Sequence, residues 1–245
     1  MPGVARAPIV WRPATVTEVV DETPEARTLR FDVPGWPGHE AGQHVDVRLT
    51  AEDGYVAERS YSIASSPEDV RLALTIERID DGEVSPYLTE ELRVGDAIEL
   101  RGPIGGFFTW KSENGGPLLL VGGGSGIVPL MSMLRHHRDR ASQVDARLLL
   151  SARTADAILY RSELDALDRA RVSYTLTRAR PPGWGGFDRR VDAEMLTAVG
   201  PSPSARPHIY VCGPTPFVEA VADLLVSLGH DPAAIRAERF GPTGG

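Results

Sequence analysis

The segment Leu118-Leu119-Leu120-Val121-Gly122-Gly123-Gly124-Ser125-Gly126-Ile127-Val128-Pro129 decides the fold of the second half of the chain. Its four apolar residues predict a buried strand, and its glycines predict a tight turn into a helix that begins near Ile127. Such a turn lets backbone N–H groups at a helix N-terminus approach a pyrophosphate. Pro129 is tolerated in the first helical turn, where its missing N–H costs nothing. We therefore predict a dinucleotide-binding turn, with a purely structural turn as the alternative. The candidate contacts are Gly124, Ser125 and Gly126.

The rest of the second half alternates strands with helices. Strands are expected at 118–121, 146–151, 172–177, 208–212 and 235–240, and helices at 127–138, 162–170, 192–199 and 216–228. Strands that alternate with helices predict right-handed crossovers and a parallel sheet.

The first half has short alternating runs separated by turn residues, which predict an antiparallel sheet and a small barrel. The best helix candidate there is Ser85–Leu92. The runs are Thr15–Val20, Arg27–Val33, His44–Leu49, Arg71–Ile76 and Ala97–Leu100. A polar break at residues 111–116 separates the two textures. The predicted fold is an N-terminal antiparallel β-barrel domain, residues 1–113, followed by a parallel-sheet α/β domain, residues 114–245.

Composition narrows the function and the location. The chain has 245 residues and a net charge of -8, which argues against a nucleic-acid-binding protein. Cys212 is its only cysteine, so it cannot form an internal disulfide or hold a cluster on four thiolates. The six histidines have no ligand spacing, so no metal site is expected. No apolar run has membrane-spanning length and the N-terminus has no signal-peptide core, so we expect a cytoplasmic protein without membrane insertion.

The ends of the next two strands predict the type of nucleotide. An NAD site places an acidic side chain at such a strand end to bind the ribose hydroxyls. This chain has Ser151-Ala152-Arg153 after one strand and Thr177-Arg178 after the next. Two arginines at the carboxyl ends of parallel strands can clamp a 2′-phosphate, so NADPH is favoured over NADH. The alternative is that both arginines are merely solvated. The candidate contacts are Ser151, Arg153, Thr177 and Arg178.

Four motifs follow one another along the chain. Arg59-Ser60-Tyr61-Ser62 supplies a cation, an aromatic face and hydroxyls, and Gly124–Pro129 reads G-x-G-x-x-P. Gly102–Gly105 reads G-P-x-G, and Cys212-Gly213-Pro214 reads C-G-P. This order resembles the ferredoxin–NADP(+) reductase family. The resemblance covers the chain from Thr15 to Phe240 and is closest to bacterial FAD-binding oxidoreductases that lack an iron–sulfur domain.

The resemblance implies which residues bind FAD. Arg59 would pair with the pyrophosphate, Tyr61 would lie on the isoalloxazine face, and Ser62 would hydrogen-bond near flavin N5. Ser60 belongs to the same motif. A second set would meet the pyrophosphate or flank the flavin, although a helix N-cap is an equal alternative for Ser85. This set is Thr75, Ile76, Glu77, Gly82, Val84 and Ser85.

The resemblance also implies a nicotinamide site. Cys212 would lie near the nicotinamide ring with Gly213 and Pro214 beside it, and Phe240 would belong to a tail that covers the flavin. The alternative is a buried cysteine that only fills space. The implied catalytic residues are Ser62, Cys212 and Glu238.

The implied activity is FAD-dependent oxidation of NADPH, with electrons passed to a ferredoxin or to an iron–sulfur oxygenase component. Three alternatives stay open at this point. They are a flavin-binding electron-transfer subunit without catalysis, a nucleotide-binding module without flavin, and a reductase of free flavins or haem.

Overall fold

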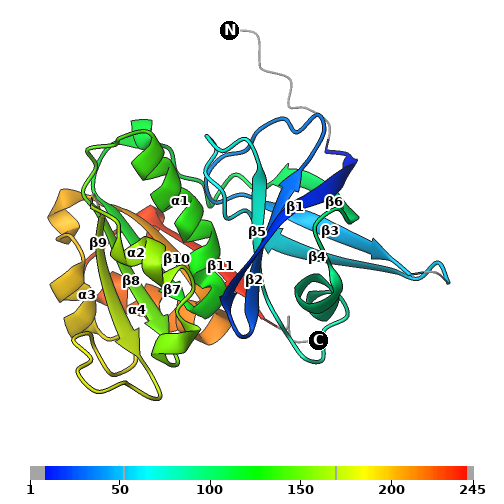
Figure 1. Cartoon of the computed structure of the whole chain (residues 1–245). Coiled ribbons are helices and arrows are strands. Elements are labelled where there is room, and N and C mark those ends of the chain that lie inside the picture. Colours follow the sequence, from blue (N-terminus) through cyan, green and yellow to red (C-terminus); the bar gives the residue numbers. More distant parts are fainter. Residues whose placement is uncertain (1–8, 52, 169, 242–245) are drawn as a thin grey trace, which may run out of the picture.

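The computed structural model describes residues 9–51, 53–168 and 170–241. It contains two sheets that lie side by side, the N-terminal one in blue to green and the C-terminal one in green to red (Figure 1). Residues 105–117 connect them. Within the described ranges, no helix has both the length and the apolar character that crossing a bilayer requires.

The N-terminal sheet has six strands, which pair antiparallel in the order β4-β3-β6-β1-β2-β5. A bridge between Ile63 and Leu74 joins the two ends of this order, so the sheet closes into a barrel. The predicted antiparallel barrel is confirmed. The strands are β1 (Trp11–Thr23), β2 (Ala26–Asp32), β3 (His44–Thr50), β4 (Val56–Ser62), β5 (Leu72–Glu77) and β6 (Ala97–Ile104).

The barrel is filled by the apolar side of its alternating strands. Phe31, Val47 and Leu100 are fully buried in this core. One end is covered by a π-helical turn, η1 (Tyr87–Glu91), whose Leu88 is fully buried in the same core. This turn lies where the sequence predicts the barrel's helix.

The C-terminal sheet has five parallel strands in the order β11-β10-β7-β8-β9. The predicted α/β architecture is confirmed. The strands are β7 (Leu118–Gly123), β8 (Ala146–Ala152), β9 (Ala170–Leu176), β10 (His208–Pro214) and β11 (Ile235–Phe240). The helices are α1 (Ile127–Asp139), α2 (Arg161–Asp165), α3 (Ala193–Val199) and α4 (Thr215–Ser227).

Helices cover both faces of this sheet. Leu118 and Leu120 pack on the face that carries α1 and α2. Leu119 and Val121, whose side chains alternate with them, pack on the face that carries α3 and α4. This two-sided burial explains why β7 has an unbroken apolar sequence.

One predicted helix is shorter than expected. The pattern predicts a helix over 162–170, but α2 ends at Asp165. Ala170 is the first residue of β9 and pairs with Ala146 of β8. Pairing with β8 places the end of the predicted helical segment in a strand, so the helix is about one turn shorter than predicted.

The two sheets share part of one core at their junction. Ala64, Phe108 and Trp110 come from the N-terminal half, yet they belong to the same buried cluster as Leu130 and Met133 of α1. Trp110 is completely buried there. The shared core fixes where the flavin motif on β4 and the glycine turn after β7 lie relative to each other.

Candidate active site

The glycine turn lies at the carboxyl end of β7 and leads directly into α1. Gly124 has φ +56, a left-handed conformation that favours glycine, and a Cβ there would meet open space. Gly126 is packed differently, since a Cβ on it would lie 2.1 Å from the carbonyl oxygen of Cys212. The turn is therefore open on the side of Gly124 and pressed against the end of β10 on the side of Gly126.

Three strand ends meet beside this turn. Cys212 is the register partner of Gly122 on β7 and of Glu238 on β11. Gly213 follows Cys212, and a Cβ on Gly213 would lie 2.7 Å from Cδ1 of Phe217. Ligands bind at the carboxyl ends of strands in open parallel sheets, so this is the expected place for the nicotinamide half of a dinucleotide.

Glu238 is a half-buried acid at this junction. Its Oε2 atom is buried and has no hydrogen-bond partner among the described residues. Burial raises the pKa of Glu238 to about 7. The pKa of the Cys212 thiol is also raised well above its usual value, by burial first and then by the Glu238 charge. A carboxyl that titrates near neutral pH thus lies beside a thiol that stays protonated.

The barrel contributes His44 and Ser62 to the same place. Nδ1 of His44 lies 3.9 Å from Oε1 of Glu238, across the junction between the two sheets. Burial lowers the pKa of His44, which favours its neutral form. His44 and Ser62 are directly opposite each other on β3 and β4, so their side chains share a face. The structure therefore places Cys212 beside Glu238, brings His44 of the barrel within 3.9 Å of Glu238, and puts Ser62 opposite His44 on the barrel.

The other face of β4 carries Arg59 and Tyr61. Arg59 pairs with Glu83 at 2.7 Å, and Glu83 also accepts a hydrogen bond from the Tyr55 hydroxyl at 2.8 Å. Tyr61 packs against the barrel core, and burial raises its pKa to about 12. Ser60 lies on the face of Ser62 and donates to Asp46 at 2.7 Å. The strand thus presents an exposed guanidinium beside a half-buried aromatic ring.

The loop of residues 82–85, which is predicted to meet the FAD pyrophosphate, is fixed by its own side chains. Ser85 accepts a hydrogen bond from the backbone N–H of Ile79 at 3.0 Å and is buried. Val84 is part of the barrel core. A Cβ on Gly82 would lie 2.9 Å from both the Ile79 carbonyl oxygen and Ser85 Oγ. The Ser85 and Val84 side chains face inward and fix the backbone of this loop. Backbone N–H groups are therefore the part of the loop that could bind an anion.

On β5 the predicted contacts point in different directions. The Thr75 side chain is buried and hydrogen-bonds Thr28 at 2.7 Å. Ile76 is in the barrel core, and Glu77 is exposed. Any contact from Thr75 or Ile76 to a cofactor is therefore left to their backbone atoms.

The two candidate 2′-phosphate arginines lie next to each other. The backbone N–H of Arg178 donates to the carbonyl of Arg153 at 3.0 Å, and that of Thr177 donates to Ala152 at 3.0 Å. Both arginines are exposed, and neither is paired with a carboxylate among the described residues. Ser151 is the register partner of Gly123, so β8 continues the line from the glycine turn to the arginines.

Phe240 ends β11 beside Pro214 and packs, partly buried, against the shared core. The residues from 242 onward lie outside the described part of the chain. No cluster of three or more histidine, cysteine, aspartate or glutamate side chains suited to a metal ion occurs within the described ranges.

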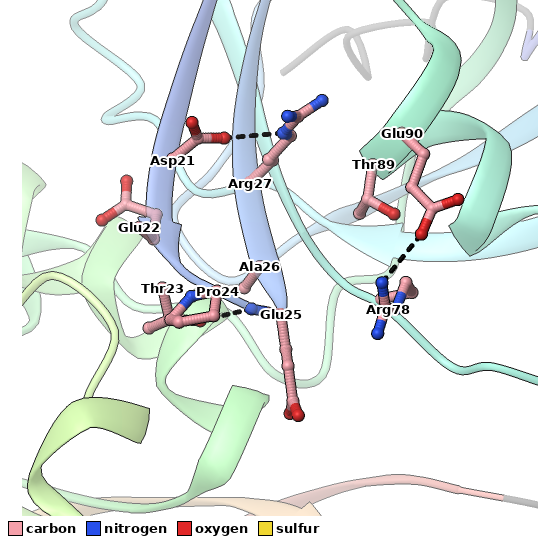
Figure 2. A pocket seen from close by; sticks show the side chains of 10 residues that line it. All are labelled: Asp21, Glu22, Thr23, Pro24, Glu25, Ala26, Arg27, Arg78, Thr89 and Glu90. Atoms are coloured by element: carbon pink, nitrogen blue, oxygen red, sulfur yellow. Dashed lines mark hydrogen bonds and ion pairs between the residues drawn. The ribbon is translucent and has the colours of Figure 1, made fainter.

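A separate cleft of about 380 Å³ lies between the turn that joins β1 to β2 and η1 (Figure 2). Four of its charged side chains form two ion pairs. Arg27 lies 2.6 Å from Asp21, and Arg78 lies 2.7 Å from Glu90. None of the predicted site residues lines this cleft.

The comparisons with known proteins cover both halves of the chain. Residues 13–109 match the oxidoreductase FAD-binding domain, and residues 120–223 match the oxidoreductase NAD-binding domain. Ferredoxin–NADP reductase B of Sorangium cellulosum is 35% identical over 82% of this chain and 85% of that protein. The chain belongs to the ferredoxin–NADP(+) reductase family.

Other members of the reductase family and solved structures agree with this assignment. The glycine betaine monooxygenase reductase subunit of Chromohalobacter salexigens is 35% identical over 92% of this chain, which spans 63% of the length of that relative. A cytochrome P450 reductase of Amycolatopsis has a TM-score of 0.83 at 27% identity and covers 99% of this chain and 73% of its own. A ferredoxin NADP+ reductase of Neisseria gonorrhoeae, with bound FAD and NADP, has the same fold, with a TM-score of 0.79 at 23% identity over 94% of this chain and 98% of its own.

The residues present fit the two cofactors of the reductase family. Gly124 leaves a cradle that any Cβ would narrow, and the unpaired Arg153 and Arg178 suit a phosphate. Arg59 already holds an anion, the Glu83 carboxylate. The unpartnered Oε2 of Glu238 faces the same junction.

Sequence reasoning missed His44 and Glu83. His44 was only the first residue of an expected strand, and Glu83 was one residue of the phosphate loop. The signal for His44 is its register opposite Ser62, which becomes visible only when β3 and β4 are paired.

Proposed function

We propose that this chain is an FAD-dependent reductase that oxidises NADPH and passes single electrons to a ferredoxin or to an iron–sulfur oxygenase component. The observation that supports this most is the meeting of Ser62 and His44, from the barrel, with Cys212 and Glu238, from the α/β domain. A reaction between groups held by the two domains requires such a meeting. The two domains are residues 1–113 and 114–245.

When bound, the nicotinamide supplies a hydride and the flavin supplies the means to release electrons one at a time. The chain supplies positions for both. The glycine turn and the N-terminus of α1 hold the dinucleotide pyrophosphate, and Arg59 with the backbone of the Gly82 loop holds that of FAD. Tyr61 provides an apolar platform for the flavin.

The junction residues manage protons and space. Glu238 can hold or release a proton at Oε2 near neutral pH, because burial raises its pKa to about 7. Ser62 offers a hydroxyl on the same side. Cys212 stays a neutral thiol and acts as a small apolar wall, since its pKa is raised by burial and by Glu238.

The donor is NADPH rather than NADH in this proposal. Two unpaired guanidiniums from adjacent backbone positions suit a 2′-phosphate, which NADH lacks. The acceptor carries its own iron–sulfur centre, because the single cysteine of this chain cannot bind one. We place the activity in the cytoplasm, where NADPH and reduced electron carriers are available.

The visible spectrum of the purified protein tests the proposal. A bound yellow chromophore that bleaches on anaerobic addition of NADPH is the expected result. A chromophore that NADPH leaves oxidised identifies a flavin-binding subunit instead. A colourless protein that cannot be reconstituted with FAD overturns the proposal.

A further inference from the structure

Helix α1 is tied to the chain that follows the flavin motif. Ser132 and Arg135 lie one turn apart on the same face of α1. Ser132 donates to the Ser65 carbonyl at 2.6 Å, and Arg135 donates to the Ala64 carbonyl at 2.7 Å. Ala64 lies only two residues after Ser62. The helix that begins at the glycine turn therefore holds the end of the flavin strand directly.

Arg135 is at the centre of this tie. Its side chain is 7% exposed. Nε and Nη2 donate to the two carboxylate oxygens of Glu163, at 3.0 and 2.6 Å. The guanidinium carbon lies 4.9 Å from the centre of the Tyr160 ring. A planar fork with partners on three sides has one available position, so Arg135 cannot shift without breaking several contacts.

Tyr160 forms a second tie in the same place. It is buried and has φ +57, which is unusual for a bulky residue and marks a backbone held under strain. Its hydroxyl donates to Thr75 Oγ1 on β5. Thr75 in turn bonds Thr28 on β2, which donates to Glu22 at the edge of the cleft in Figure 2. In this left-handed backbone conformation, the Tyr160 hydroxyl reaches across the junction to the barrel strand β5.

We propose that Arg135 and Tyr160 are positioning residues, which set the separation of the flavin strand and the glycine turn and thereby the rate of hydride transfer between the two cofactors. This rests on the proposed function. Neither residue acts on the reacting atoms itself. Arg135 acts through the Ala64 carbonyl and Tyr160 through Thr75, two of the points at which the N-terminal half contacts the α/β domain.

The test compares Arg135→Met with Arg138→Met. Arg138 lies on the same helix and also donates to Glu163, but its other partner is Asp139, and within the described residues no hydrogen bond or ion pair joins it to the barrel. Each variant thus loses one charge and its bonds to Glu163. Stopped-flow reduction of the bound flavin by NADPH should be about tenfold to a hundredfold slower in Arg135→Met, with KM changed less than about twofold. Arg138→Met should stay within about twofold of the parent in both.

Two smaller changes support the same test. Tyr160→Phe removes only the hydroxyl and should slow reduction by about threefold to tenfold. Arg135→Lys keeps the charge and can still reach one carbonyl, so it should recover part of the rate. If Arg135→Met does not fold, Tyr160→Phe and Ser132→Ala decide the outcome.

Hydrogen exchange of the flavin-free protein gives a readout that does not depend on activity. Amides of residues 63–66 should exchange at least about tenfold faster in Arg135→Met than in Arg138→Met. Equal exchange in the two variants, or a change in KM without a change in the reduction rate, overturns the positioning role. Failure of NADPH to reduce the parent protein overturns the proposed function instead.

Discussion

The two sides of the junction between the sheets use buried polar groups in opposite ways. On the helix side, the polar groups of Arg135 and Tyr160 are hydrogen-bonded, Arg135 to Glu163 and Ala64 and Tyr160 to Thr75. On the strand side, Glu238 has a buried oxygen without a hydrogen-bond partner among the described residues, and His44 lies 3.9 Å from its other oxygen. Satisfied groups hold a geometry, whereas an unsatisfied acid with a raised pKa is ready to bind or release a proton.

The largest effect on stability is expected from a substitution in the glycine turn, at the residue that packs against the end of β10. Gly126→Ala places a Cβ 2.1 Å from the Cys212 carbonyl oxygen, a clash with a backbone atom that no side-chain rotation can relieve. We expect a loss of at least about 3 kcal/mol in the free energy of unfolding, measured in urea. The control is Gly124→Ala, where the space is open and only the left-handed φ of +56 is unfavourable, so about 1–2 kcal/mol is expected. Equal losses in the two variants would show that packing against β10 is unimportant.

The next effect concerns unpaired arginines, which contrast with the fully paired Arg135. The double change Arg153→Ala and Arg178→Ala should lower the preference for NADPH over NADH by about a hundredfold or more, since each of the two lost charged hydrogen bonds contributes about 1.5–3 kcal/mol. The measurement is the ratio of kcat/KM for the two donors. Arg180→Ala is the control, because Arg180 is already paired with Asp188. An unchanged ratio in the double variant contradicts the assignment of the 2′-phosphate site.

The unpartnered acid predicts how stability depends on pH. The folded protein holds the proton of Glu238 up to about pH 7, whereas the usual pKa is 4.5. The contribution of Glu238 to the free energy of unfolding is therefore fully present below pH 4.5. It falls by about 1–3 kcal/mol as the pH rises to about 7. Glu238→Gln should remove this fall, and urea unfolding between pH 5 and 8 measures it. Glu219→Gln, which removes a charge from the exposed side of α4, should keep the parent's slope.

The smallest effect is expected at the exposed pair on the flavin strand. Glu83 and Arg59 are both about half exposed, so their pairing contributes only about 0.2–1 kcal/mol. Since Glu83 occupies the guanidinium that FAD phosphate needs, Glu83→Gln should tighten FAD binding by about twofold to fivefold, as followed by flavin fluorescence. Tyr55→Phe removes the other partner of Glu83 and serves as the control. Weaker binding in Glu83→Gln would mean that Glu83 itself helps to hold FAD.

Local pattern was enough to predict both sheets and the glycine turn. The run from Leu118 to Val121 predicts a buried strand because both of its faces are apolar, and the structure confirms it. Helix α2 was predicted too long, because the pairing of Ala170 with Ala146 competes with the helix and cannot be read from either segment alone.

The chemistry of the site was only partly accessible in the same way. Ser62, Cys212 and Glu238 came from motifs, and each motif lies within one segment. The contact of His44 with Glu238, and that of Arg135 with Ala64, join residues from different domains. No periodicity or spacing encodes such a contact, since it depends on how the two sheets pack.

The core shared by Ala64, Phe108 and Trp110 with α1 limits how this chain can be re-engineered. A chimera that exchanges the flavin half at residue 113 would replace these three side chains and keep the helix shaped to receive them. The exchange would expose the apolar face of α1 that these side chains cover. The hybrid would then self-associate through that face, or its barrel would no longer pack against the helix. Successful grafts will have to carry the inward face of α1 along with the barrel.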